Sequence, residues 1–207
     1  MSVEDAITAV QRGDPVLVHD AADREDETDL VYPAEAVGWE EVRRLRNDAG
    51  GLVCVAVPYQ AGDQFDLPLL DDVFDDVGDA PSYDDRSSFS YSVNHVSTRT
   101  GITDRDRATT IQKLAEAVDS SDFTFREEFR APGHVPLLVA ARDGLRQRRG
   151  HTELAVDLLQ RADVTPAAVV CEMLDDDTGE ALPREKAQRY ADENDLVFLD
   201  GADLVGR

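Results

Sequence analysis

Two uninterrupted apolar runs place the strongest constraint on the fold of this chain. They are Leu52–Val57, which ends at Pro58, and Ala167–Cys171. A short apolar run without polar alternation is typical of a β-strand that is buried on both faces. A sheet built from such strands needs helices on each side. We therefore predict an α+β fold: a single three-layer domain, residues 1–207, with a mixed β-sheet flanked by helices.

The remaining elements follow from hydrophobic spacing and from turn residues. The predicted helices are Val3–Gln11, Trp39–Asp48, a helix capped at Thr103 or Asp104 that runs to Val118, a helix entered at Gly150–Glu153, and Arg184–Asn194. Further predicted strands are Pro15–His19, Leu30–Tyr32, Phe89–Val93, Val135–Ala141 and Leu196–Leu199. We expect a turn at Ala131–His134, and a long surface excursion over Tyr59–Asp85 with one short helix near Leu67–Leu70.

Composition excludes several classes of protein. The 44 acidic and 21 basic residues give a net charge of −23, which argues against nucleic acid as a partner and indicates an acidic, salt-adapted surface. Cys54 and Cys171 form neither a disulfide framework nor a zinc-type spacing. The absence of a signal sequence and of a membrane-length apolar run predicts a cytoplasmic protein without membrane contact. No glycine-rich nucleotide motif is present, so we expect no organic cofactor.

A dense acidic segment, Asp23–Asp29, lies between the first two predicted strands. In an extended segment, the carboxylates of Glu25, Glu27 and Asp29 would share one face. They could be paired with Arg24, or they could bind a divalent cation through their oxygens. The alternative is a solvated acidic loop, which is common in a chain of this composition.

Four other polar sites stand at predicted element ends. Arg148–Thr152 combines cations with free backbone N–H groups at a helix N-terminus, as a phosphate site would, although a simple helix cap is the alternative. Thr100–Gly101 could supply a second set of donors before another helix. His134 follows a Pro-Gly pair and could be only a turn residue. Glu172 directly follows a buried strand, where an unpaired carboxylate is costly unless the protein uses it.

These segments together resemble the 3,4-dihydroxy-2-butanone-4-phosphate synthase family of riboflavin biosynthesis. The matching blocks, in order, are Asp23–Asp29, Thr100–Ala108, Pro132–His134, Arg148–Glu153 and Cys171–Met173. The resemblance implies a lyase that converts D-ribulose 5-phosphate to L-3,4-dihydroxy-2-butanone 4-phosphate and releases formate. It also implies Mg²⁺, with Mn²⁺ able to substitute, and a homodimer whose sites lie at the subunit interface.

The resemblance also implies roles for individual residues. The implied metal ligands are Glu25 and His151. The implied substrate contacts are Arg24, Glu25, Asp29, Thr100, Arg148, Arg149, Gly150, His151, Thr152 and Glu172. The implied catalytic residues are His134, Glu172, Glu27 and Cys54.

The chain departs from the family pattern at a few positions. Many members have Asn in place of Asp26 and Gly in place of Thr28, and Asn94–His95 stands where others have an acidic residue. We expect these departures to change shape without loss of function. The chain ends at Arg207, so we expect a monofunctional enzyme without a GTP cyclohydrolase II domain.

Two other functions use similar residues. A magnesium-dependent phosphosugar isomerase or phosphatase would need the same acids and the same phosphate site. A non-catalytic nucleotide- or RNA-binding module is the second alternative, and the charge of −23 argues against it.

Overall fold

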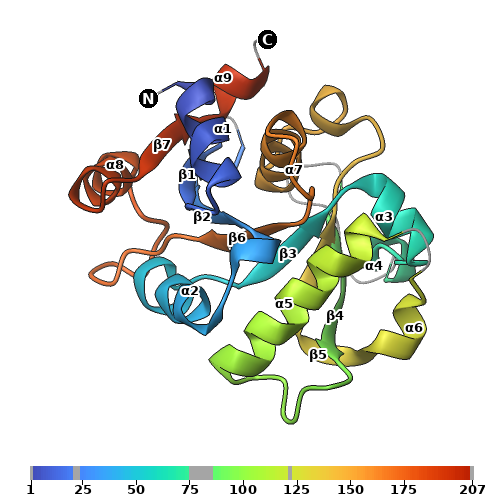
Figure 1. Ribbon diagram of the computed structural model, residues 1–207. Helices are drawn as coiled ribbons and strands as arrows, with labels where there is room; N and C mark the ends of the chain where they lie inside the picture. Colours follow the sequence, from blue (N-terminus) through green and yellow to red (C-terminus); the bar gives the residue numbers. More distant parts are fainter. Residues whose placement is uncertain (1, 21–23, 75–85, 121–122, 206–207) are drawn as a thin grey trace.

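A mixed seven-stranded sheet forms the centre of the computed structural model, which describes residues 2–20, 24–74, 86–120 and 123–205 (Figure 1). The strands lie in the order β4-β5-β3-β6-β2-β1-β7. Their bounds are β1 Val16–His19, β2 Thr28–Pro33, β3 Cys54–Val57, β4 Phe89–His95, β5 Phe129–Val139, β6 Ala168–Glu172 and β7 Val197–Asp200. The pairs β1/β7 and β3/β5 are parallel, and the other neighbours are antiparallel.

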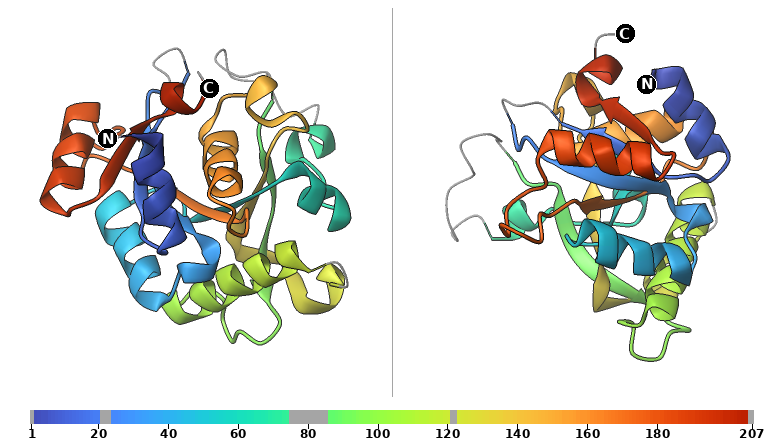
Figure 2. Two further views of the ribbon diagram at one scale, coloured as in Figure 1. Left: turned by 45° about the horizontal axis from the view of Figure 1, so that its top comes forward. Right: turned by 90° about the vertical axis from the view of Figure 1, so that its left-hand side faces the viewer.

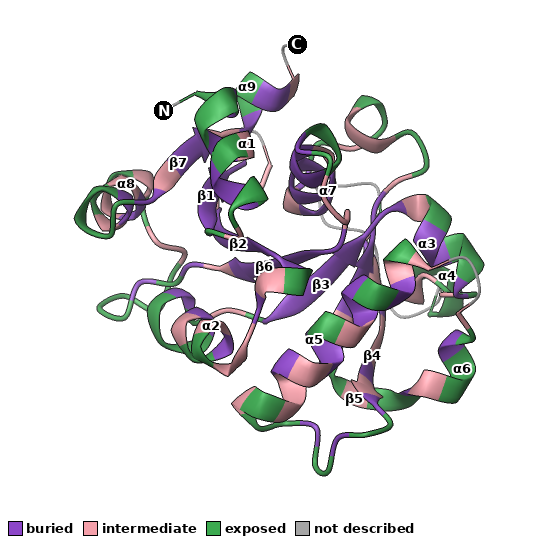
Figure 3. Cartoon of the chain, viewed as in Figure 1, coloured by how far each residue is buried: buried purple, intermediate pink, exposed green. Residues whose placement is uncertain are grey.

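Helices cover both faces of this sheet, so the domain has three layers, as the apolar runs predicted (Figures 1 and 2). One face packs against α1 Val3–Gln11, α7 His151–Arg161 and α9 Gly201–Val205. The opposite face packs against α2 Trp39–Arg44, α3 Tyr59–Gln64, α5 Asp104–Asp119, α6 Phe125–Glu128 and α8 Arg184–Glu193. Figure 3 shows buried strands between helices whose outer surfaces are exposed.

The helix ends agree with the capping residues in the sequence. α5 begins after Thr103, whose hydroxyl accepts a hydrogen bond from the N–H of Asp106 at 3.1 Å. The predicted helix at Trp39–Asp48 is confirmed as α2, and the chain continues as the π-helix Leu45–Ala49.

The turn predicted at Ala131–His134 is not a connection between elements, because these residues lie inside β5, where they form a bulge between the pairs Val93/Val135 and Asn94/Arg130. Proline interrupts a strand only where its missing N–H is not needed. β5 pairs with β3 over Leu137–Val139 alone, so Pro132 lies on an unpaired edge.

The helices α3, α6 and α9 were not predicted. Tyr59–Gln64 forms α3, whereas α4, over Leu70–Val73, adjoins the place where one short helix near Leu67–Leu70 was expected. The predicted excursion over Tyr59–Asp85 therefore begins with a helix, and its last part, residues 75–85, lies outside the described residues. α9 was missed because its five residues give no helical period.

Candidate active site

The acidic segment is the connection of the β1–β2 hairpin, and Asp20 organises its base. The two oxygens of the buried Asp20 carboxylate accept hydrogen bonds from the N–H groups of Glu25 at 3.3 Å and Glu27 at 3.0 Å. Asp26, between them, has a φ of 56°. The chain is therefore curled here, and the expectation that Glu25 and Glu27 share the face of an extended strand is wrong. Asp23 lies outside the described residues.

Glu25 is bonded to His151, the first residue of α7. The distance from Glu25 Oε2 to His151 Nδ1 is 2.9 Å, and both side chains are largely buried. The hydrogen bond from His151 lowers the pKa of Glu25, although burial opposes this effect. Burial alone would lower the pKa of His151. The charge of Asp29, the hydrogen bond with Glu25 and the charge of Glu25 together raise this pKa to about 9.

Asp29 and Glu27 place two further carboxylates beside this pair. Asp29 is 1% exposed, and neither of its carboxylate oxygens has a hydrogen-bond partner within the described residues. Burial raises the pKa of Asp29 to about 7, although the charge of His151 opposes the shift. The pKa of Glu27 is also raised, by burial and then by the charges of Glu25 and Glu172. Such groups are suited to proton transfer near neutral pH.

The segment that was predicted to bind an anion forms the N-terminus of α7. A Cβ atom on Gly150 would meet the guanidinium of Arg148 and would lie 3.0 Å from Nη2 of Arg24, so glycine lets both cations approach the helix end. Thr152 is fully buried, and its hydroxyl has no hydrogen-bond partner in the described part of the chain. Arg149 is exposed beside it. Cations, free N–H groups and an unused hydroxyl suit a phosphate.

Glu172 ends β6 next to Asp29, with which it is paired in the sheet. Its Oε2 accepts a hydrogen bond of 2.8 Å from the N–H of Leu52. This contact depends on Gly51, since a Cβ there would lie 2.6 Å from the Glu172 carbonyl oxygen. Cys54 is fully buried nearby, and burial, followed by the charge of Glu172, raises the pKa of its thiol well above the usual value.

His134 and Thr100 belong to a second cluster. His134 donates its N–H to Asn94 Oδ1 at 2.9 Å, and the hydroxyl of Thr100 donates to Asp106 at 3.2 Å. Gly101 also donates to Asp106, at 2.8 Å, so the donors predicted for an anion bind this carboxylate instead. β3 and β6 separate β5 from β2, a span of roughly 14 Å at the usual strand spacing. One chain therefore does not bring His134 to the Glu25–His151 pair through the sheet.

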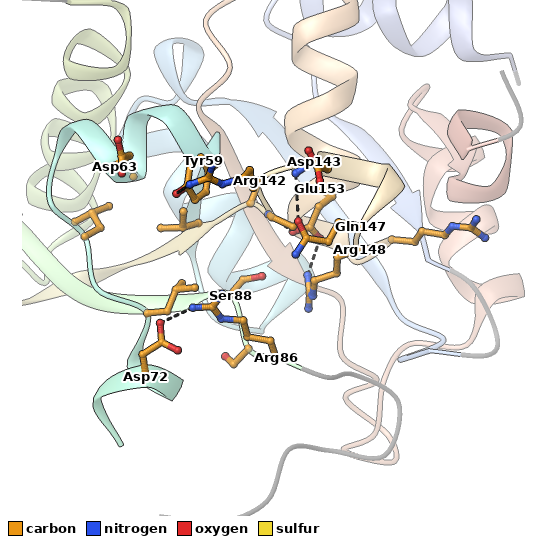
Figure 4. A pocket seen from close by; sticks show the side chains of 18 of the residues that line it. Tyr59, Asp63, Asp72, Arg86, Ser88, Arg142, Asp143, Gln147, Arg148 and Glu153 are labelled. Carbon is orange, nitrogen blue, oxygen red and sulfur yellow. Dashed lines mark hydrogen bonds and ion pairs between the residues drawn. The ribbon is translucent and has the colours of Figure 1, made fainter. Parts of the chain in front are cut away.

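A cleft of about 1140 Å³ opens beside the N-terminus of α7 (Figure 4). Arg24, Arg148 and Arg149 line this cleft, and so do Tyr59 and Arg142, which Figure 4 shows apart from Arg148. Glu153 is buried in its wall, where it binds Arg148 Nη1 at 2.7 Å and the N–H of Ala141 at 2.9 Å. The cleft is wide enough for a small phosphorylated ligand to reach the helix terminus.

Comparison with known proteins assigns this arrangement to a family. The family model described as 3,4-dihydroxy-2-butanone 4-phosphate synthase matches residues 4–206. The chain belongs to the 3,4-dihydroxy-2-butanone 4-phosphate synthase family.

Relatives of the same name support this assignment. The synthase of Methanosarcina mazei is 46% identical, over 99% of this chain and 90% of the relative. That of Methanothermobacter thermautotrophicus is 44% identical, over 98% of this chain and 94% of the relative. A crystal structure of a 3,4-dihydroxy-2-butanone 4-phosphate synthase in complex with two magnesium ions has 30% identity and a TM-score of 0.87. It covers 100% of this chain and 95% of its own.

Within this member of the synthase family, the residues expected from the sequence fall into two groups. The first group surrounds the Glu25–His151 pair and consists of Arg24, Glu27, Asp29, Arg148, Arg149, Gly150, Thr152, Glu172 and Cys54. The second group is His134 and Thr100. No group of three or more His, Cys, Asp or Glu side chains is arranged to hold a metal ion in the described ranges.

Two site residues were missed from the sequence. Asp20 follows the buried strand β1 just as Glu172 follows β6, so the same strand-end signal could have identified it. Glu153 gave no such signal, because an acid in the first turn of a helix is ordinary. None of the described helices is both long and apolar enough to cross a membrane.

Proposed function

We propose that the chain performs the reaction of its family at the cluster around Glu25 and His151. The enzyme converts D-ribulose 5-phosphate to L-3,4-dihydroxy-2-butanone 4-phosphate and formate, in riboflavin biosynthesis. The observation that carries the location is the 2.9 Å contact between the hairpin loop and the N-terminus of α7. This contact supports the location, because carboxylates and an imidazole then lie beside the helix terminus at which a phosphate would bind.

Glu25 and His151 would hold Mg²⁺, with Mn²⁺ able to substitute. The Glu25 carboxylate oxygen and the His151 imidazole nitrogen contact each other, and both can ligate a cation. The cation would then replace the proton that the two groups share. Two protein ligands suffice for Mg²⁺, because this ion keeps several waters or substrate oxygens. The related synthase in complex with two magnesium ions supports this assignment. The bound ion would supply Lewis-acid polarisation of neighbouring sugar oxygens.

The substrate phosphate would bind at the N-terminus of α7. Arg24 and Arg148 approach Gly150 there, and the unused Thr152 hydroxyl is available as a donor. Arg149 is exposed at the same terminus and adds a third cation. The phosphate would orient the sugar so that its hydroxyl groups face Glu25 and Asp29.

Proton transfer would involve the remaining carboxylates. Asp29, with a pKa of about 7, and Glu27, with a raised pKa, can accept and return protons while the ketose enolises. Glu172 stands beside Asp29 in the sheet, where it can act on the same carbon skeleton. Cys54 lies beneath them as a buried thiol.

A homodimer would complete the site with His134 and Thr100 of the partner subunit. Four exposed apolar side chains lie on segments near the strand ends: Leu52, Val96, Ile102 and Leu174. Burying such side chains is a usual driving force for association. Both cysteines are free and buried, which agrees with a reducing, cytoplasmic location, and the proposed reaction uses no organic cofactor.

An assay of formate release from ribulose 5-phosphate, with and without chelator, tests the function. We expect release that disappears with chelator and returns with Mg²⁺ or Mn²⁺, over a range of salt concentrations. Isomerised sugar or free phosphate without formate would instead identify an isomerase or a phosphatase. Light scattering, recorded as the protein elutes from a size-exclusion column, gives its molar mass and so tests the dimer. A monomer with full activity would refute the shared site.

A further inference from the structure

His19 contacts the acidic loop from the face of the sheet opposite His151. Its Nδ1 lies 3.0 Å from Thr28 Oγ1, and its Nε2 lies 3.4 Å from Asp26 Oδ1. His19 and Thr28 are cross-strand partners, so their side chains share one face. Val18 and Asp29, the next pair, face the α7 side instead.

The loop is therefore held from both faces at consecutive residues. Glu25 reaches His151 on one face, whereas Asp26 reaches His19 on the other. Asp26 itself is in the left-handed conformation, with φ at 56°. Asp20 accepts hydrogen bonds from the backbone N–H groups of Glu25 and Glu27 and pairs with Arg24 at 3.8 Å, and none of these contacts fixes the direction of the Glu25 or Glu27 side chain.

The imidazole itself is firmly placed. His19 is 3% exposed, and its ring stacks on Phe198 of β7 with centroids 6.1 Å apart and planes inclined by 28°. The Nε2 atom lies near a carboxylate oxygen of Asp26, and the Nδ1 atom lies within hydrogen-bond distance of the Thr28 hydroxyl. Each nitrogen thus has one loop partner.

We propose that His19 is a positioning residue, which holds Asp26 and thereby directs Glu25 toward His151 and the metal site. This role rests on the proposed function. Without the contact, the carboxylate of Asp26 would be free to turn toward Glu25, and repulsion between neighbouring carboxylates would spread the loop over several conformations. Asn at position 26 would lack the charge of Asp26, and Gly at position 28 would lack the hydroxyl of Thr28. The contact with His19 is therefore complete only in a chain that has both Asp26 and Thr28.

The test is His19→Phe, which keeps an aromatic ring on Phe198 and removes both nitrogens. Mn²⁺ binding, followed by electron paramagnetic resonance, should weaken on the order of tenfold, as is usual when a residue that orients a metal ligand is lost. The Mg²⁺ concentration for half-maximal formate release should rise by a similar factor. A matched control is Arg184→Gln, because Arg184 lies over the same Phe198 ring, 5.5 Å from its centroid, and its described ion pair is with Asp200 of β7, outside the loop. This control should bind Mn²⁺ as the wild type does.

A double-mutant cycle with Asp26→Gly decides whether His19 acts through Asp26, since glycine keeps the positive φ without the carboxylate. The double variant should bind Mn²⁺ no more weakly than Asp26→Gly alone. The proposal would be overturned if the losses of Mn²⁺ affinity in His19→Phe and Asp26→Gly added up in the double variant. It would also be overturned if Arg184→Gln lost as much affinity as His19→Phe, or if His19→Phe bound Mn²⁺ as the wild type does. If the wild type binds Mn²⁺ but releases no formate, the proposed function is refuted. The role of His19 in metal binding is then still tested by the Mn²⁺ titrations followed by electron paramagnetic resonance.

Discussion

Glu25 and His151 lie 126 residues apart in the sequence, and a hydrogen bond of 2.9 Å joins their side chains. The contact exists because α7 packs on the face of the sheet from which the β1–β2 hairpin projects. Its position therefore depends on the packing of the core as well as on the conformation of the loop. A change that leaves the core intact should affect chemistry and leave folding unchanged.

Glu25→Gln should retain the fold and lose magnesium-dependent formate release. The amide oxygen can still accept a hydrogen bond from His151, but the side chain no longer carries the charge that attracts a cation. Loss of a group that merely orients a ligand costs roughly 10- to 100-fold, so we expect a fall of at least about 100-fold. Glu185→Gln, an exposed change in α8, is the matched control. Turnover near the wild-type level in Glu25→Gln would contradict the metal assignment.

Glu172→Gln should abolish turnover and retain binding of ribulose 5-phosphate. Its oxygen can still accept the hydrogen bond from the N–H of Leu52, so the strand end stays in place. The missing element is a carboxylate that can take up a proton. Calorimetric titration with the sugar phosphate and a melting curve check this. If binding disappears while the melting temperature is unchanged, Glu172 holds the substrate.

The layered fold was predictable because the apolar runs alone identify strands that need cover on both faces. Leu52–Val57 and Ala167–Cys171 contain the buried strands β3 and β6, which pair with each other. The order of the strands was not predictable, since it depends on which strands pair across long separations. The turn expected at Pro132 failed because the sequence does not show which edge of a strand remains unpaired.

The site was predictable only in part, for similar reasons. Acids and cations at strand and helix ends identified Glu25, His151 and Glu172 as candidates. The contacts of Asp20 with backbone N–H groups and of His19 with Asp26 depend on the curl of the loop, which a left-handed residue at position 26 produces. Aspartate adopts that conformation more readily than most residues other than glycine, but the sequence does not show which of its many aspartates does so.

Cys171 gives a pH dependence of stability with a definite sign. Burial, followed by the charge of Glu172, raises the pKa of its thiol from 9.0 to about 12. The stability that the protonated thiol contributes is complete below pH 9 and is lost as the pH rises toward 12, because the unfolded thiol ionises first.

Urea unfolding of the wild type and of Cys171→Ala at several pH values checks this prediction. Between pH 9 and pH 12, the free energy of unfolding of the wild type should fall relative to that of the variant, by about 1.4 kcal/mol per pH unit. Cys54 is present in both proteins, so its own titration cancels. Parallel curves for the two proteins would contradict the raised pKa.

Arg148→Met should destabilise the fold as well as weaken substrate binding. The side chain of Glu153 is 0% exposed and that of Arg148 is 12% exposed, and their ion pair spans 2.7 Å. Removing the cation leaves a buried carboxylate whose described hydrogen bonds reduce to the N–H of Ala141, which costs about 3–5 kcal/mol. Urea unfolding measures this cost.

Arg149→Met, at the exposed neighbour, should change stability by less than about 0.5 kcal/mol. Adding Glu153→Gln to Arg148→Met should recover part of the loss, because an amide is cheaper to bury than a charge. Equal effects at the two arginines would show that the buried pair contributes nothing specific.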